Sequence, residues 1–478
     1  MKQLLKNYKV ENPDKIISVI PLLIGAIFLF IYHPMYQTMD DLDMRFVFEG
    51  SAGNTGPQDF ALYTNIYYGK FLKFFYSVWN DFFWYDFFEY FFMSVSFFII
   101  LYSFFKFILK ETYVKILFAT VISMFCCVFF VLPQFTQVSG ILTISAMSVI
   151  YVIFVADLSK KEQILFAAYF VLAITFSFLI REMMCLTAAF YASLAFLPLY
   201  LANFKKIMRH FFRNVTPVAV SLLCIFLFHV AGQKALSQND ELFDAQKMNV
   251  ARAEIQDKTS AWDHYDIPWK GLEDKIPDQP NGYVFTKEDY RMLLTTFFLG
   301  NTNVLNAENL KKASDALKDE MSIRKTRPVG FYMSNSFRKV FVLLAAFFIL
   351  GVTLKSGTLF CVYNVALFYF MIVFLNIDYK STPQRVWINL LMISFLLIFV
   401  SLRSVAFNKF RYISSVFAVL LLFSFAREEG ISAQIKYETF KTYRSEIRKM
   451  PLTGLFWIDG IFAEISSSPF QRNLYKKK

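Results

Sequence analysis

The sequence predicts an all-α polytopic membrane protein with about 11 transmembrane helices. Of the 478 residues, 56% are hydrophobic, only 18% are charged and 60 are Phe, and the mean hydropathy is +0.43. A soluble domain averages about 25% charged residues and could not keep this much apolar surface from water. Apolar windows recur along the chain, each with its flanks about as long as a hydrocarbon core of about 30 Å requires. Cytosolic enzymes, nucleic-acid-binding domains, disulfide-rich secreted proteins and outer-membrane barrels do not have this composition.

Eleven apolar segments are expected to cross the membrane. Lys and Arg recur in the N-terminal tail 1–15 and in the connections that follow every even-numbered segment. By the positive-inside rule these basic stretches lie in the cytoplasm. We therefore expect a cytoplasmic N-terminus and, because the number of crossings is odd, an extracytoplasmic C-terminus. The segments are 16–33, 82–103, 116–132, 139–157, 164–180, 184–203, 214–232, 338–355, 358–375, 386–401 and 412–425.

Most of the long polar segments outside the spans are then expected on the extracytoplasmic side. An N-terminal membrane module, 16–232, contains a long outer loop, 34–81, and a C-terminal membrane module covers 338–425. Between the modules, 233–337 is expected to form a small α-rich domain, because it contains apolar stripes at helical spacing and a capping-box start. The outer tail, 426–478, begins with a mixed-charge segment that is typical of a helix. Chemistry is accordingly expected on the outer face.

The net charge of +12 does not indicate a nucleic-acid partner. The long polar stretch 233–337 is slightly acidic, and much of the basic excess lies in short connections between spans, where it determines topology. The five Cys all lie in apolar segments and the four His are scattered. The sequence therefore predicts buried thiols and no zinc site.

The strongest candidate for a site is an acidic cluster just after the first span. Asp40, Asp41 and Asp43 place three carboxylates within four residues, which repel one another unless a cation, a metal or a hydrogen-bond donor offsets them. In a helix, Asp40 and Asp43 share a face and Asp41 can pair with Arg45. The alternative is a solvated acidic N-cap. A glycine-rich turn and an aromatic segment, 59–79, follow, and we interpret the latter as an interfacial helix beside a lipid-facing cleft.

Cations expected on the same outer surface form a second set of candidates. Arg181 and Glu182 lie in a very short connection, where charged groups face a polar cavity or a partner. Arg181 is interpreted as a fork of N–H donors for a phosphate, and the alternatives are a mutual ion pair with Glu182 or a snorkelling Arg. Lys380 and Arg385 lie between the ninth and tenth spans, either at the site or in a solvated loop. Weaker candidates are Asp86, Glu89, Gln134, Thr136 and Gln137.

These residues resemble those of the GT-C glycosyltransferases, which use polyprenyl-phosphate-linked sugars on the outer face of the membrane. More closely, the chain looks like bacterial multispan proteins related to O-antigen glucosyltransferases. The resemblance covers most of the chain as scattered positions, none diagnostic by itself: Asp40-Asp41 with Met44, Gly50, Gly56-Pro57, Tyr67-Tyr68-Gly69, Trp84-Tyr85, Ile180-Arg181, Asn249-Val250-Ala251-Arg252-Ala253 with Asp257, and Glu288-Asp289-Tyr290 with Leu293-Leu294.

The resemblance implies a GT-C-like fold in the bacterial plasma membrane and an inverting sugar transfer to a cell-surface glycan. The general base would be Asp40 or Asp41, and a spaced pair would instead use Asp41 and Asp43. Arg181 would stabilise the phosphate that leaves, with help from Arg385 or Lys380. Glu182 would also bind substrate. The carboxylates suit Mg²⁺ or Mn²⁺ without requiring either.

Three other classes of function remain open from the sequence. A cell-surface polysaccharide polymerase or ligase would depend on outer arginines such as Arg252 and Arg291 rather than on an acidic pair. A transporter of lipid-linked sugars usually has polar groups near the bilayer midplane and internal repeats, whereas the span centres here carry almost no charge. A structural or assembly partner would tolerate the loss of every candidate residue.

Overall fold

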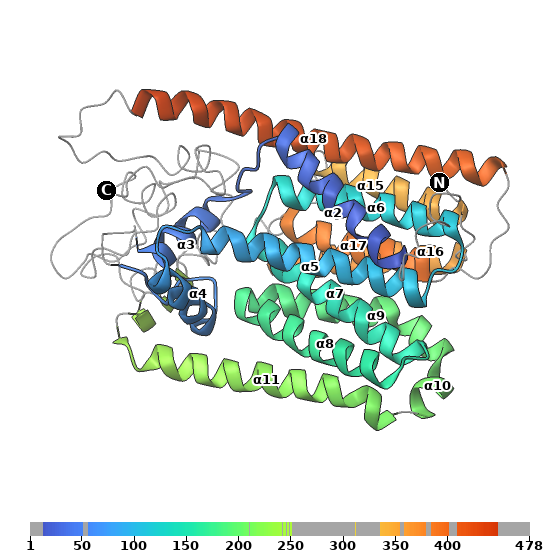
Figure 1. Cartoon of the computed structure of the whole chain (residues 1–478), viewed down its shortest axis with the longest axis horizontal. Coiled ribbons are helices and arrows are strands. Elements are labelled where there is room, and N and C mark those ends of the chain that lie inside the picture. The colour runs from blue at the N-terminus through green and yellow to red at the C-terminus, as the bar shows by residue number, and fades with distance from the viewer. Residues whose placement is uncertain are drawn as a thin grey trace.

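A computed structural model of the full chain describes residues 13–50, 56–209, 211–240, most of 242–250, 311, 335–353, 358–378, 384–400 and 409–447. Every regular element in these ranges is a helix (Figure 1). The helices are α2 (Pro13–Ile31), α3 (Met39–Glu49), α4 (Ile66–Val78), α5 (Trp84–Phe107), α6 (Thr112–Val131), α7 (Phe135–Val155), α8 (Lys160–Ile180), α9 (Glu182–Ala202), α10 (Phe204–Arg209), α11 (Phe211–Ser237), α15 (Asn335–Thr353), α16 (Thr358–Asp378), α17 (Gln384–Val400) and α18 (Lys409–Ile447).

The expectation of an all-α membrane protein is confirmed. Six described helices are long and apolar enough to cross a membrane: α5 to α9, and α11 from Asn214. Shorter apolar stretches lie in α2, α15, α16 and α17. The eleventh expected span is part of α18, a helix of 39 residues in all. The protein is therefore multi-pass, and the count of 11 crossings stays a prediction.

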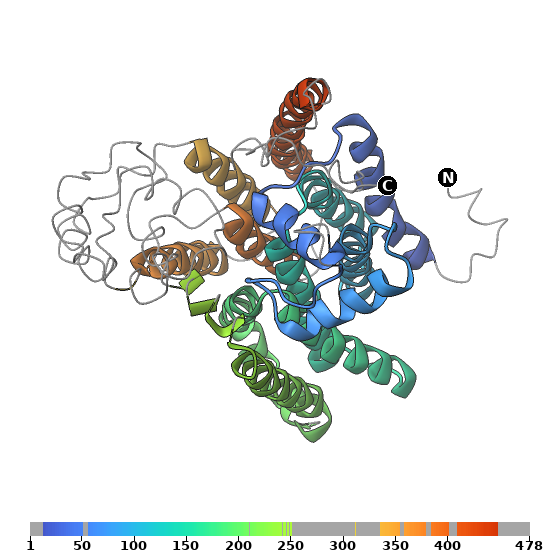
Figure 2. The same cartoon turned by 90° about the vertical axis from the view of Figure 1, so that its left-hand side faces the viewer.

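The helices run along a common direction, and the segments expected on the two sides of the membrane lie at opposite ends. In Figure 1, α3 and α4 lie at the left end of the bundle and α10, with its basic residues, lies at the right end. Viewed along the bundle, α18 and α11 flank the central helices on opposite sides (Figure 2). Which end of the bundle faces the cytoplasm stays a prediction.

Helix α7 is the centre of the bundle. Its side chains are buried on every face along most of its length, and it packs against α5, α8, α9 and α17. Its sequence allows this because small hydroxyl residues replace bulky ones on the side that faces α8. Ser139 and Thr143 both bond the Ser177 hydroxyl, at 2.9 and 2.6 Å. Close approach and interhelical hydrogen bonds of this kind stabilise helix pairs in a lipid environment.

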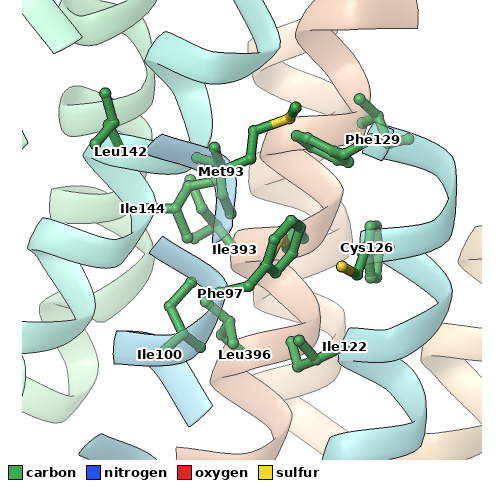
Figure 3. Close-up of a cluster of buried hydrophobic side chains, with 14 of the residues drawn as sticks. Met93, Phe97, Ile100, Ile122, Cys126, Phe129, Leu142, Ile144, Ile393 and Leu396 are labelled. Carbon is green, nitrogen blue, oxygen red and sulfur yellow. The ribbon is translucent and has the colours of Figure 1, made fainter. Parts of the chain in front are cut away.

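Apolar side chains from α5, α6, α7 and α17 fill the space between these helices. Phe97 is fully buried, and its ring meets Phe129 edge to face, with ring centroids 5.7 Å apart. Ile144 and Leu396 lie in the same cluster (Figure 3). This core holds the N-terminal and C-terminal membrane modules together, because α17 belongs to the second and the other three helices to the first.

Two expected domain boundaries fall inside continuous helices. Helix α11 extends beyond residue 232 to Ser237, and α18 passes through 425–426 without a break. The expected mixed-charge helix of the tail is therefore the extension of the last apolar segment. Most of the α-rich domain expected at 233–337 lies outside the described residues. The part of the tail beyond Ile447 also lies outside them.

Gly140 gives a test of the packing between α7 and α17. A Cβ at this position would lie 2.4 Å from Cγ of Asn389, which is fully buried. Because overpacking a buried contact costs about 1–3 kcal/mol, we expect Gly140→Ala to lower the thermal unfolding midpoint of the detergent-solubilised protein by several degrees.

The matched control for Gly140→Ala is the double variant Gly140→Ala/Asn389→Ala. Shortening Asn389 removes the clash, so the double variant should be more stable than the sum of the two single effects. Additive losses would show that the two helices do not meet at this point.

Candidate functional site

The segment between α2 and α3 runs beside the connection between α6 and α7. The Met35 N–H donates to the Val131 carbonyl at 3.0 Å, and the Gln37 N–H donates to the Pro133 carbonyl at 3.2 Å. These two bonds hold an otherwise irregular stretch against the start of the most buried helix. These bonds place the first turn of α3 beside the N-terminus of α7.

The acidic cluster lies in a helix, the case in which Asp40 and Asp43 share a face. Helix α3 follows Thr38, and Asp40 and Asp41 lie in its first turn, where carboxylates interact favourably with the helix dipole. It ends at Gly50, whose φ of +77° lies in the left-handed region that favours glycine. A Cβ on Gly50 would also lie 2.1 Å from the carbonyl carbon of Gly56. Glycine is therefore required at position 50, where the helix ends.

Asp41 is the most enclosed carboxylate of the cluster, with 0% of its surface exposed. Its Oδ1 accepts hydrogen bonds from the Phe135 N–H at 2.8 Å and from the Tyr85 hydroxyl at 3.0 Å. Its Oδ2 accepts one from Thr38 Oγ1 at 3.2 Å. Asp41 thus accepts a hydrogen bond from a backbone N–H in the first turn of α7. The N–H groups of a first turn have no partner within their own helix.

Burial raises the pKa of Asp41 from about 3.8 to about 7, because the charged form loses its hydration. The Phe135 N–H and the Tyr85 hydroxyl act in the opposite direction, and the neighbouring charge of Asp40 adds to the rise. Glu89, which is buried on α5, lies beside Asp41 and Tyr85. Asp41 therefore changes protonation state near neutral pH.

Asp40 is more accessible than Asp41 and pairs with a cation from the other membrane module. Its side chain is 21% exposed, and Oδ2 lies 3.7 Å from Nη1 of Arg385, which is 26% exposed. Arg385 is the second residue of α17. The structure therefore brings together two of the predicted site residues that are 345 positions apart in the sequence.

Arg181 lies over the rings of Tyr63 and Phe135. Its Nη1 donates to the Tyr63 carbonyl at 3.3 Å, and Cζ lies 5.1 and 5.6 Å from the ring centroids of Tyr63 and Phe135. Glu182 points elsewhere and pairs with Nδ1 of His229 at 3.2 Å. The alternative of a mutual Arg181–Glu182 ion pair stays a prediction.

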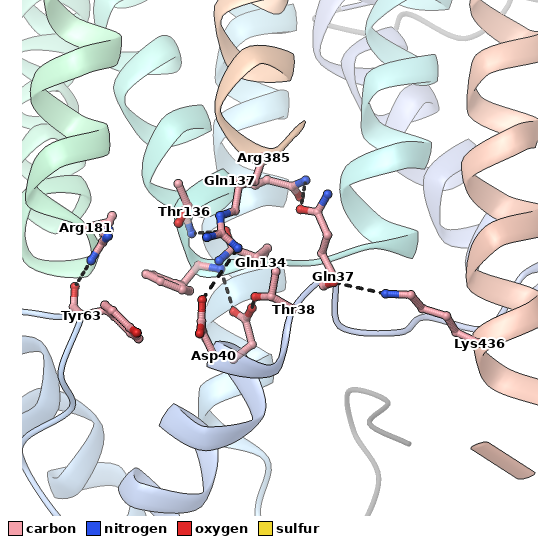
Figure 4. A network of polar contacts seen from close by, with 12 residues as sticks. Gln37, Thr38, Asp40, Tyr63, Gln134, Thr136, Gln137, Arg181, Arg385 and Lys436 are labelled. Carbon is pink, nitrogen blue, oxygen red and sulfur yellow. Dashed lines mark hydrogen bonds and ion pairs between the residues drawn. The ribbon is translucent and has the colours of Figure 1, made fainter. Parts of the chain in front are cut away.

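The N-terminal ends of four helices meet at this point. Asp41 of α3 binds the first N–H of α7, Arg385 of α17 pairs with Asp40, and Arg181, which precedes α9, contacts Phe135. Figure 4 shows Asp40 and Arg385 at the start of α7, with Arg181 to one side and Lys436 to the other. Helix N-termini carry partial positive charge and favour bound anions.

A second buried cluster beside the first has a structural arrangement. Nη1 of Arg45 lies 3.4 Å from Oδ2 of Asp86, and Nε lies 3.6 Å from Oε2 of Glu49. The Tyr36 hydroxyl donates to Asp86, and burial raises the pKa of Tyr36 well above its usual value. The expected pairing of Arg45 with Asp41 is replaced by these pairs, because α5 brings the deeply buried carboxylate of Asp86 to Arg45.

The other predicted residues have separate positions. Asp43 is partly buried on α3, and the Gln137 amide donates to Oε1 of Gln37 at 3.0 Å. Lys380, Arg252 and Arg291 lie outside the described residues. Sequence reasoning missed the Phe135 N–H, since a backbone donor has no residue signature, and it missed Lys436, which donates to the Gln37 carbonyl.

The acidic pair already has several partners within the protein. In the described ranges, no three His, Cys, Asp or Glu side chains are grouped so as to hold a metal ion. Both oxygens of Asp41 accept hydrogen bonds, and Asp40 faces the guanidinium of Arg385. A Mg²⁺ or Mn²⁺ ion on Asp40 and Asp41 stays a prediction.

The pKa of Asp41 predicts how stability depends on pH. Between about pH 4 and about 7, folded Asp41 keeps a proton that the unfolded chain has released, so the folded state loses about 1.4 kcal/mol of relative stability per pH unit from this group. The thermal midpoint should therefore fall across this window and lose this contribution in Asp41→Asn, whose amide does not ionise. Asp81→Asn, an exposed control, should keep the wild-type slope, and an unchanged slope in Asp41→Asn would contradict the assignment.

Comparisons of the chain with protein-family models, with curated proteins and with solved structures gave no match. The resemblance to GT-C glycosyltransferases thus rests on the residues quoted for it. The structure itself supports a multi-pass α-helical membrane protein in which Asp40, Asp41, Arg181 and Arg385 gather where four helices begin.

Proposed function

We propose that the chain is a membrane glycosyltransferase that transfers a sugar from a polyprenyl-phosphate-linked donor to a cell-surface glycan. The reaction would take place on the extracytoplasmic face of the bacterial plasma membrane. One observation carries the proposal: a partly exposed carboxylate, Asp40, lies beside Arg385 at the meeting point of four helix N-termini. A proton acceptor and a positive potential for a phosphate therefore occur side by side, at the end of a bundle of apolar helices.

Asp40 is the better candidate for the general base, although the sequence favours Asp40 and Asp41 equally. A base must come within hydrogen-bond reach of the acceptor hydroxyl. Asp41 has no exposed surface and accepts hydrogen bonds from Thr38, Tyr85 and the Phe135 N–H. Asp40 has exposed surface and one described ion pair. In this division Asp41 positions the helix, and Asp40 meets the substrate.

The proposed step is a single displacement. Asp40 accepts the proton of the acceptor hydroxyl while that oxygen forms a bond to the anomeric carbon. The bond between the anomeric carbon and the phosphate oxygen breaks, and its electron pair leaves with polyprenyl phosphate. Because the donor is already activated as a phosphodiester, the reaction needs no nucleotide-binding loop, and the sequence contains none.

Positive charge near the leaving phosphate is the second requirement. Arg385 has exposed surface and can contact a bound phosphate as well as Asp40. Arg181 is held by Tyr63 and Phe135, which places its charge in a fixed position, and the helix N-termini add partial charges that need no reorganisation. These groups would stabilise the charge that develops as the glycosidic oxygen departs.

Replacement of Asp40 tests the proposal directly. We expect Asp40→Asn to reduce sugar transfer by about a hundredfold or more, because an amide does not accept the proton. Transfer would be measured in membranes that contain a polyprenyl-phosphate-sugar pool, at protein levels matched to the wild type. Asp81→Asn is the matched carboxylate control and should transfer at the wild-type rate.

Comparing sugar transfer by Asp40→Asn and Asp41→Asn distinguishes a glycosyltransferase from the other functions that remain open. Asp41→Asn should retain more transfer than Asp40→Asn, because Asn still accepts hydrogen bonds from Tyr85 and the Phe135 N–H. Full transfer in both variants would rule out Asp40 and Asp41 as the base and would favour a polymerase, a ligase or a transporter.

Replacement of Arg385 tests the role of positive charge. Arg385→Met should lower kcat by about a hundredfold, since one preorganised charge stabilises the transition state by that order, whereas Arg385→Lys should keep part of the activity. Single-turnover kinetics would separate this loss from weaker donor binding. An unchanged kcat in Arg385→Met would contradict a role for this residue in the chemical step.

A further inference from the structure

The second half of α18 lies against the segment that leads into α3. At Gly430, an added Cβ would lie 2.8 to 3.0 Å from ring atoms of Tyr32, so the helix backbone contacts the ring directly. Ala433, one turn further on, is fully buried. Residues three to four apart share a helix face, and the small size of these two side chains permits the close approach.

The same face of α18 makes two further contacts with this segment. The rings of His33 and Tyr437 lie with centroids 4.1 Å apart. Nζ of Lys436 donates a hydrogen bond to the Gln37 carbonyl at 3.2 Å (Figure 4). The contacts therefore follow the chain from Tyr32 to Gln37, which immediately precedes Thr38 and α3.

Gln37 is bound on both sides. Lys436 holds its carbonyl, the Gln137 amide of α7 donates to its side chain at 3.0 Å, and its own N–H donates to Pro133. Helix α18 is itself anchored, since Nζ of Lys339 on α15 lies 2.5 Å from Oε1 of Glu429, whose side chain is 2% exposed. The start of α3 is thus clamped between α7 and a helix some 400 residues further along the chain.

We propose that Lys436 is a positioning residue for the site, which fixes the start of α3 and hence the place of Asp40. Its hydrogen bond is to the Gln37 carbonyl, so Lys436 acts through Gln37 and Thr38. The consequence for sugar transfer rests on the proposed function, whereas the coupling between α18 and α3 does not. Small misplacements of a reacting group slow a reaction without weakening substrate binding to the same degree.

Hydrogen exchange of the amides of 39–49 in the full-length protein tests the coupling without any activity assay. Lys436→Met removes the donor and keeps the length of the side chain, and we expect exchange in α3 to become about three- to tenfold faster. Gly430→Ala, which pushes α18 away from Tyr32, should have the same effect. Lys436→Arg, which keeps a donor, and Lys441→Met, which removes an exposed cation from the same helix, should exchange like the wild type.

Kinetics test the positioning role. Lys436→Met should lower kcat about three- to tenfold and leave KM for the donor within about twofold, and Lys436→Arg should restore kcat. Unchanged exchange in both Lys436→Met and Gly430→Ala would overturn the coupling. Faster exchange with wild-type kcat would overturn the positioning role. If the wild type itself transfers no sugar, the proposed function fails, and the exchange result still decides the coupling.

Discussion

At the start of α7, the Phe135 N–H needs a hydrogen-bond partner in surroundings that exclude water, and the carboxylate of Asp41 supplies it. An unpaired donor at this depth would cost about 1–3 kcal/mol. Meeting this requirement places α3 across the end of the most buried helix. It also explains why Tyr85 and Thr38 surround the same carboxylate, and why burial raises its pKa to about 7.

The charges around α3 separate into an inner and an outer group. Inside, Arg45 is neutralised by Asp86 and Glu49, and removing one member of such a buried set leaves an uncompensated charge. Outside, Asp40 and Arg385 keep about a fifth to a quarter of their surface exposed. A fully buried carboxylate and a partly exposed one therefore lie side by side, and the charge of Asp40 contributes to the raised pKa of Asp41.

Helices from distant parts of the chain position the acids, the backbone donor and the cation of the site. Helix α3 supplies the acids, α7 the backbone donor and α17 the cation, and the apolar core of α5, α6, α7 and α17 fixes their relative positions. Helix α18 clamps the entry to α3 through Gln37. A change in the packing of any of these helices is accordingly expected to shift the position of Asp40.

The class of protein follows from the order of the amino acids alone, because mean hydropathy and span length depend only on composition along the chain. The same sequence singles out Asp40, Arg181 and Arg385 as candidates, and it gives the spacing by which Asp40 and Asp43 share a face once the acidic stretch is helical. The folded structure adds that Arg385 pairs with Asp40, that Arg45 pairs with Asp86, and that α18 continues past residue 425 to reach Gln37. These contacts join residues far apart in the chain or use backbone atoms, and neither leaves a pattern in the order of the amino acids.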